Sequence, residues 1–214
     1  MNISYQEVIN WFKGNLKTLV ILEAACLLVA TVYFLTAPRI YEANFSIGLP
    51  KVPAAISNNS NAPQIRLLMS PQEFIRPTQD PMAYSDEFIK NCMGEDTNAN
   101  RKKFISSLQL GVKQQGDVIA FALRLEGSER SGACANLLLT KVLNDLSVTQ
   151  DNYLKSAGIA TSETVNIAKP GIIQNVRMSD SYIKPDLIKV LTSAALAGIF
   201  LTVFLSVMRK RYSA

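Results

Sequence analysis

LKTLVILEAACLLVATVYFLTAP, residues 16–38, is the stretch that decides the architecture of this chain. Its apolar part, Thr18 to Ala37, would span about 30 Å as a helix, which matches the hydrocarbon thickness of a bilayer. Tyr33 and Phe34 lie at the outer end, where aromatic residues favour the membrane interface, and Pro38 ends the run. The stretch predicts a transmembrane helix over residues 17–37.

A cleaved signal peptide is the alternative interpretation of this stretch. Its polar leader would have to hold residues 1–17, which include the large apolar side chains of Trp11 and Phe12. The best small residue for cleavage is Ala37, but Pro38 follows it directly. These features favour an uncleaved membrane anchor.

A second apolar run covers residues 187–208 and is followed by Arg209, Lys210 and Arg211. Because basic residues beside membrane segments mark the cytoplasmic side, this cluster predicts a cytoplasmic tail over residues 209–214. Lys13 and Lys17 predict the same side for the N-terminal segment, residues 1–16. Residues 38–186 are then expected to form a domain in the periplasm, or outside the cell, held by two spans in a bacterial inner membrane.

Charge and composition exclude several classes of function. The chain carries a net charge of +5, but residues 38–186 hold 16 Lys and Arg against 15 Asp and Glu, so no basic surface for nucleic acid is expected. The absence of histidine excludes His-based triads and His metal ligands. No phosphate-binding, dinucleotide-binding or nucleophile-elbow motif occurs. We therefore predict a non-enzymatic protein with no catalytic, cofactor-binding or metal-binding residues.

The pattern between the membrane segments predicts a small α+β domain with one long amphipathic helix. The expected strands alternate apolar and polar residues, and the expected helices begin at Ser or Asp caps. In chain order we expect a strand at 39–49, a loop at 50–64, a helix from Ser70, a second helix from Asp80 or Ser85, a hairpin of 102–115 with 117–127, a helix from Ser128 to about Lys155, a strand at 164–168 and a linker to Pro185. The first and last strands, which lead from and to the membrane, are expected to pair.

Three cysteines have different expected roles. Cys92 and Cys134 fall in the predicted periplasmic domain, where an oxidising compartment favours a disulfide over two buried thiols. Such a bond would close a loop of about 40 residues and tie the short helices to the long one. Cys26 lies inside the first membrane segment, where it packs as a small apolar residue.

Two features inside the membrane segments are candidate contact sites. Glu23 either makes a buried polar contact with a neighbouring helix or reaches the cytoplasmic headgroups, since an ionised carboxylate within a bilayer is unfavourable. Ala194 and Gly198, with Ala195, form a small-residue face suited to close helix packing.

The layout resembles the Wzz family of polysaccharide co-polymerases. The resemblance rests on the strand Pro38-Arg-Ile-Tyr-Glu-Ala after the first membrane helix, the helix start at Ser70-Pro71, the hairpin before a long helix, and Lys184-Pro-Asp186 leading into an Ala/Gly-rich second membrane helix. The chain departs from the family pattern because it is short and lacks the long periplasmic stalk helix. It resembles the membrane-proximal base alone.

This resemblance implies a regulator of the chain length of O-antigen or a related glycan in lipopolysaccharide biosynthesis. It implies a ring-shaped homo-oligomer that acts with a Wzy-type polymerase on a lipid-linked glycan among membrane lipids. The alternative is a structural adaptor of an envelope export or secretion complex, which would have the same topology and no role in glycan length.

Overall fold

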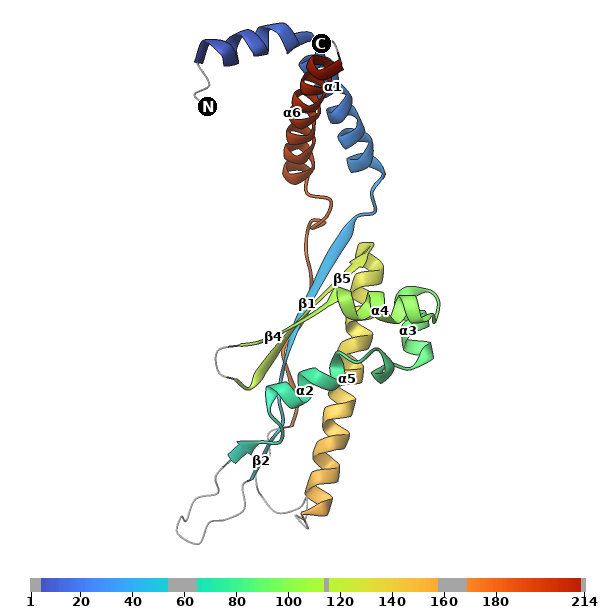
Figure 1. Ribbon diagram of the computed structural model, residues 1–214. Helices are drawn as coiled ribbons and strands as arrows, with labels where there is room; N and C mark the ends of the chain where they lie inside the picture. Colours follow the sequence, from blue (N-terminus) through green and yellow to red (C-terminus); the bar gives the residue numbers. More distant parts are fainter. Residues whose placement is uncertain (1–4, 54–64, 114–115, 158–168, 213–214) are drawn as a thin grey trace. The chain divides into compact units, whose positions relative to one another are not determined.

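The computed structural model describes residues 5–53, 65–113, 116–157 and 169–212. The chain divides into two compact units (Figure 1). The terminal helix unit comprises Met1–Arg39 and Lys184–Ala214, and the central domain comprises Ile40–Ile183. The predicted α+β class, with an apolar helix at each end of a small mixed domain, is confirmed.

The terminal helix unit consists of α1 (Tyr5–Thr36) and α6 (Leu187–Tyr212), which pack against each other. Lys13–Thr36 of α1 and Leu187–Arg209 of α6 are long and apolar enough to cross a membrane, with mean hydropathies of 2.3 and 2.2. Most of their large apolar side chains are exposed, as expected of helices whose surroundings are lipid.

The central domain is built on a four-stranded antiparallel sheet. Its strand order is β4 (Leu108–Val112), β5 (Val118–Glu126), β1 (Ile40–Gly48) and β6 (Gly171–Met178). β1 and β5 alternate as their sequences predict, so Phe45 and Phe121 are direct partners and their rings stack at 4.4 Å between centroids. A separate two-stranded sheet pairs β2 (Lys51–Pro53) with β3 (Ile65–Leu67).

Helices cover the apolar face of this sheet. They are α2 (Pro71–Thr78), the 3-10 helix η1 (Pro81–Ala83), α3 (Asp86–Met93), α4 (Asn98–Ser107) and the long α5 (Ser128–Ser156). α5 contacts β1, β5 and β6 along that face (Figure 1). The core contains Phe45, Ile47, Phe121 and Leu123 from the sheet and Leu138 from α5, each at most 1% exposed.

The last strand of the domain lies later in the chain than predicted. Residues 171–178, which were expected to be a linker, form β6 and pair with β1. The predicted strand at 164–168 lies outside the described residues. β6 is an edge strand with no fully buried residue, so its sequence carries little of the alternation that marks a half-buried strand. The expectation that the last strand pairs with the first is confirmed at this new position.

The first half of the predicted hairpin was also wrong, because residues 102–107 belong to helix α4. Thr97 caps this helix by accepting a hydrogen bond from the Asn100 amide at 3.1 Å. One turn later Arg101 is buried, and its guanidinium donates to the Tyr84 carbonyl at 2.6 Å and pairs with Asp96 at 2.7 Å. These tertiary contacts fix α4 although the local pattern resembles a strand. Within the described part of this arm, Leu108–Val112 pairs with β5 as the hairpin requires.

One predicted helix start is confirmed, and the others differ in detail. Ser70 caps α2 in the predicted capping box, with Glu73 accepting from the Ser70 amide at 2.7 Å. α5, however, begins after Gly127, whose φ of 81° is open to glycine, and the predicted cap Ser128 is already the first helical residue. Both proposed starts after Pro77 are used, one by η1 and one by α3.

Candidate functional site

The contact between α1 and α6 runs along one line of small residues on α6. Ala194, Gly198, Thr202 and Ser206 recur at four-residue spacing and so share one face of the helix. Ala194 is 8% exposed and Thr202 is fully buried, although neighbouring large side chains of α6 are exposed. Small side chains on this face allow the backbones of the two helices to approach closely.

Glu23 of α1 lies directly against Gly198. A Cβ atom at position 198 would stand 2.0 Å from Oε2 of Glu23 and 3.2 Å from its Cα. A side chain at position 198 would therefore require the Glu23 carboxylate to move and the two backbones to separate by a few tenths of an ångström. Among the described residues, Oε2 of Glu23 is buried and has no hydrogen-bond partner. The Glu23 side chain thus packs against α6, and the choice between a polar contact with a neighbouring helix and a reach to the headgroups stays a prediction.

A hydrogen bond between the helices lies near the other end of the pair. The Ser206 hydroxyl donates to Oδ1 of Asn15 at 2.9 Å. Asn15 precedes Glu23 by the same number of residues as Ser206 follows Gly198. The two contacts, Asn15–Ser206 and Glu23–Gly198, therefore fit one antiparallel register. Sequence analysis missed the Asn15–Ser206 contact. The available signal was a pair of polar residues at matching depth in two apolar helices.

A groove of about 530 Å³ lies between the two helices, and its lining includes Leu22 and Ala197, the neighbours in sequence of Glu23 and Gly198. Small residues of both helices line it, including Ala25, Ala30, Ser193 and Ala197. Cys26, predicted to pack as a small apolar residue, also lines the groove and is a free thiol.

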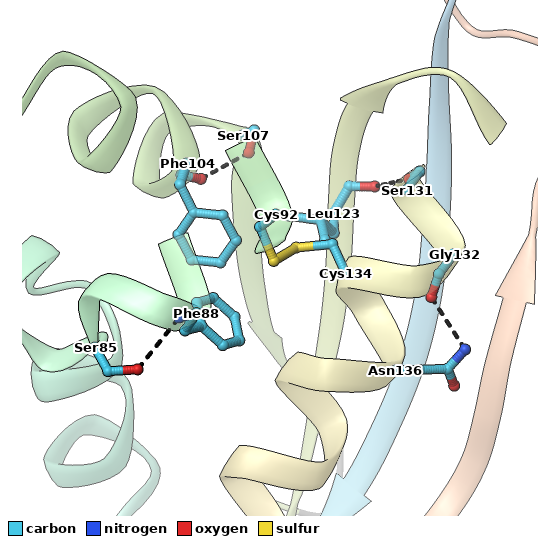
Figure 2. The surroundings of a disulfide bond; sticks show 10 residues. All are labelled: Ser85, Phe88, Cys92, Phe104, Ser107, Leu123, Ser131, Gly132, Cys134 and Asn136. Carbon is cyan, nitrogen blue, oxygen red and sulfur yellow. Dashed lines mark hydrogen bonds between the residues drawn. A yellow bond between two sulfur atoms is a disulfide. The ribbon is translucent and has the colours of Figure 1, made fainter. Parts of the chain in front are cut away.

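The central domain contains the Cys92–Cys134 disulfide, which joins α3 to α5 (Figure 2). The two Cα atoms are 5.0 Å apart, and both residues are at most 1% exposed. Phe88 and Phe104 lie beside the bond, with their ring centroids 5.4 Å apart. The bond therefore fixes the short helices to the helix that covers the sheet.

Glu42 and Asp117 of the central domain are held in ion pairs. Glu42 accepts from Asn44 at 2.9 Å and from Arg124 at 2.6 Å, and these hydrogen bonds lower the pKa of Glu42. Lys51 pairs with Asp117 at 2.9 Å and lowers the pKa of that carboxyl. Within the described parts of the chain, no group of three His, Cys, Asp or Glu residues is placed to hold a metal ion.

No protein-family model matches the sequence, and no curated protein matches it. Among solved structures, the chain is similar to a full-length bacterial polysaccharide co-polymerase. The TM-score is 0.46 and the sequence identity is 9%, over 97% of this chain and 99% of that chain.

Proposed function

We propose that this protein is a non-enzymatic regulator of polysaccharide chain length in a bacterial inner membrane. It acts as a ring-shaped homo-oligomer beside a Wzy-type polymerase, on a lipid-linked glycan, with both termini in the cytoplasm and the central domain in the periplasm. The sequence resemblance at Pro38–Ala43, at Ser70-Pro71 and at Lys184–Asp186 points to this role.

The observation that carries the proposal is the pairing of β1 with the returning end of the domain. β6 runs antiparallel to β1, and the bonds continue beyond it: the Ser179 amide donates to the Glu42 carbonyl and the Ile183 amide to the Ile40 carbonyl, each at 2.8 Å. Ile40 and Ile183 are the first and last residues of the domain. A domain closed in this way is one rigid module between two apolar helices, which suits a subunit that is repeated around a ring.

The chemistry of the carboxylates also supports a role without catalysis. A general acid needs a raised pKa, because it must hold its proton near neutral pH. The pKa values of Glu42 and Asp117 are lowered instead, and each carboxylate is bound to a cation. Their charges are used to hold strands and loops together. Control of chain length by subunit surfaces needs no covalent step.

The helix pair is the surface that we assign to contact within the membrane. Glu23, Ala194 and Gly198 fix how α1 and α6 meet, and the groove beside them is open to a third helix. The polymerase, or a second copy of this chain, would bind at this groove. The central domain would supply the remaining contacts between subunits.

Lipopolysaccharide banding on gels tests the proposal. Deletion of the gene should replace the modal ladder by an unregulated one, and the wild-type gene should restore it. Gly198→Leu should fail to restore it at equal protein level, while Thr192→Leu, an exposed position on the same helix, should succeed. Ladders that stay unchanged for several glycan types would refute a role in chain length and leave the adaptor of an export complex as the better explanation.

A further inference from the structure

A cavity of about 250 Å³ lies in the central domain between α2, η1 and α5. It is separate from the membrane helices and from the disulfide, and the function proposed above makes no use of it. It is somewhat smaller than the roughly 300–1,000 Å³ pockets that hold drug-sized ligands. Its size suits a ligand of about one sugar ring.

The inner wall of the cavity is apolar. Phe74 comes from α2, Tyr84 follows η1, and Val142 and Leu146 come from one face of α5. All four are at most 7% exposed, so they are held in place by the core behind them. A wall of this kind offers aromatic edges and aliphatic surface to the C–H face of a ligand.

The mouth of the cavity is polar and carries groups from two helices. Lys141, Asp145 and Thr149 lie at successive turns of α5, and Glu73 lies opposite on α2. Lys141 Nζ contacts Asp145 Oδ2 at 2.5 Å and lies 5.6 Å from the centre of the Tyr84 ring. Glu73 is held ionised, because the Ser70 amide donates to it and lowers its pKa. The cavity lining thus includes two carboxylates, one ammonium and the hydroxyls of Thr78 and Thr149.

This set of groups selects among small ligands. Two carboxylates disfavour an anion, and the ammonium of Lys141 both disfavours a cation and already neutralises Asp145. A neutral ligand with several hydroxyl groups satisfies both kinds of partner, since each hydroxyl can donate to a carboxylate and accept from Lys141 or Thr149. Its ring hydrogens would face the apolar wall.

We propose that this cavity is a binding site for one neutral pyranose ring of the polysaccharide. The proposal rests on the proposed function for the source of the sugar, and it adds a place where the central domain holds the growing chain. The bound ring would lie against Phe74 and Leu146, with its hydroxyls toward Glu73 and Asp145. A single weak site of this kind would bind successive sugar rings of the chain, one at a time, as the chain grows.

Saturation-transfer NMR on the full-length protein tests this site. The protein is held in a zwitterionic detergent without a sugar headgroup, and the probes are D-glucose, D-galactose, N-acetyl-D-glucosamine and, as a cationic comparison, N-acetyl-lysine amide. At least one sugar should receive saturation from the protein. Thr149→Trp, which fills the mouth, should abolish the transfer, whereas Val148→Trp, the neighbouring exposed residue outside the cavity, should not.

A second variant keeps the shape of the cavity and changes its chemistry. Asp145→Asn should weaken sugar binding by about five-fold, the usual effect of losing one hydrogen bond. Failure of all three sugars to bind, equal transfer in Thr149→Trp, or binding of the lysine probe alone would overturn the proposal.

The gel assay separates this outcome from the proposed function. A ladder that depends on the gene, together with no sugar binding, would remove only the cavity proposal. Sugar binding with a ladder that does not depend on the gene would remove the chain-length role.

Discussion

Loss of the Cys92–Cys134 disulfide should destabilise the central domain by an amount that follows from its position in the chain. The cysteines are 42 residues apart. In the chain-entropy model a loop of this length lowers the entropy of the unfolded chain enough to stabilise the fold by about 4 kcal/mol at 25 °C. For a domain of about 150 residues this corresponds to a fall in Tm of about 10 °C.

Thermal unfolding of the full-length protein in detergent, followed by near-ultraviolet circular dichroism, measures this loss. Cys92→Ala and Cys134→Ala should each lose nearly the whole amount, and the double variant should lose little more, because either change alone removes the bond. Cys26→Ala, which leaves the bond intact, is the control. A loss below about 1 kcal/mol, or additive losses in the two single variants, would refute the loop-closure argument. Two thiols that react with an alkylating agent in the unreduced protein would refute the bond itself.

Three further perturbations test other contacts. Gly198→Leu should separate α1 from α6 and abolish cross-linking between cysteines introduced at positions 15 and 206. The control, Thr192→Leu, should leave the cross-link intact. An unchanged cross-link in both variants would contradict the close contact between Gly198 and Glu23. Arg101→Ala should lower the Tm of the domain by several degrees, because it leaves Asp96 and the Tyr84 carbonyl without their buried donor. Lys102→Ala, at an exposed position, is the control, and an equal fall in Tm in both variants would show that Arg101 does not hold α4. The lowered pKa of Glu42 means that its contribution to stability is present above its ordinary pKa of 4.5 and is lost as pH falls through the lower folded value. Denaturation midpoints measured between pH 5 and pH 3 should therefore fall more steeply in the wild type than in Glu42→Gln, and parallel curves would exclude this contribution.

The elements that were predictable from sequence are those whose signal is local. The apolar runs of α1 and α6, the alternation of β1 and β5, and the capping box of Ser70 and Glu73 each depend on neighbours within a few residues. The residue pattern within each segment was enough to identify these elements. The pairing of the first and last strands followed from their connection to the two apolar helices.

Elements fixed by distant contacts were not predictable. α4 depends on Arg101. Its guanidinium pairs with Asp86 and Asp96 and donates to the Tyr84 carbonyl, and these partners lie outside α4. β6 is a strand because β1 offers it a hydrogen-bonding edge, not because of its own pattern. In the helix pair, Glu23 and Gly198 were recognised as separate features, but only the antiparallel register brings them together.

The hydrogen bond from the Ile183 amide to the Ile40 carbonyl has a consequence for the two ends of the central domain. Where the chain leaves and re-enters the central domain, its two segments are one strand spacing apart, about 4.8 Å. That gap is too narrow to admit a lipid tail, a sugar chain or a helix. The two ends of the central domain are therefore tied to each other, and neither can move away without breaking this hydrogen bond. A displacement of the chain at Ile40 would be passed directly to Ile183, and the reverse.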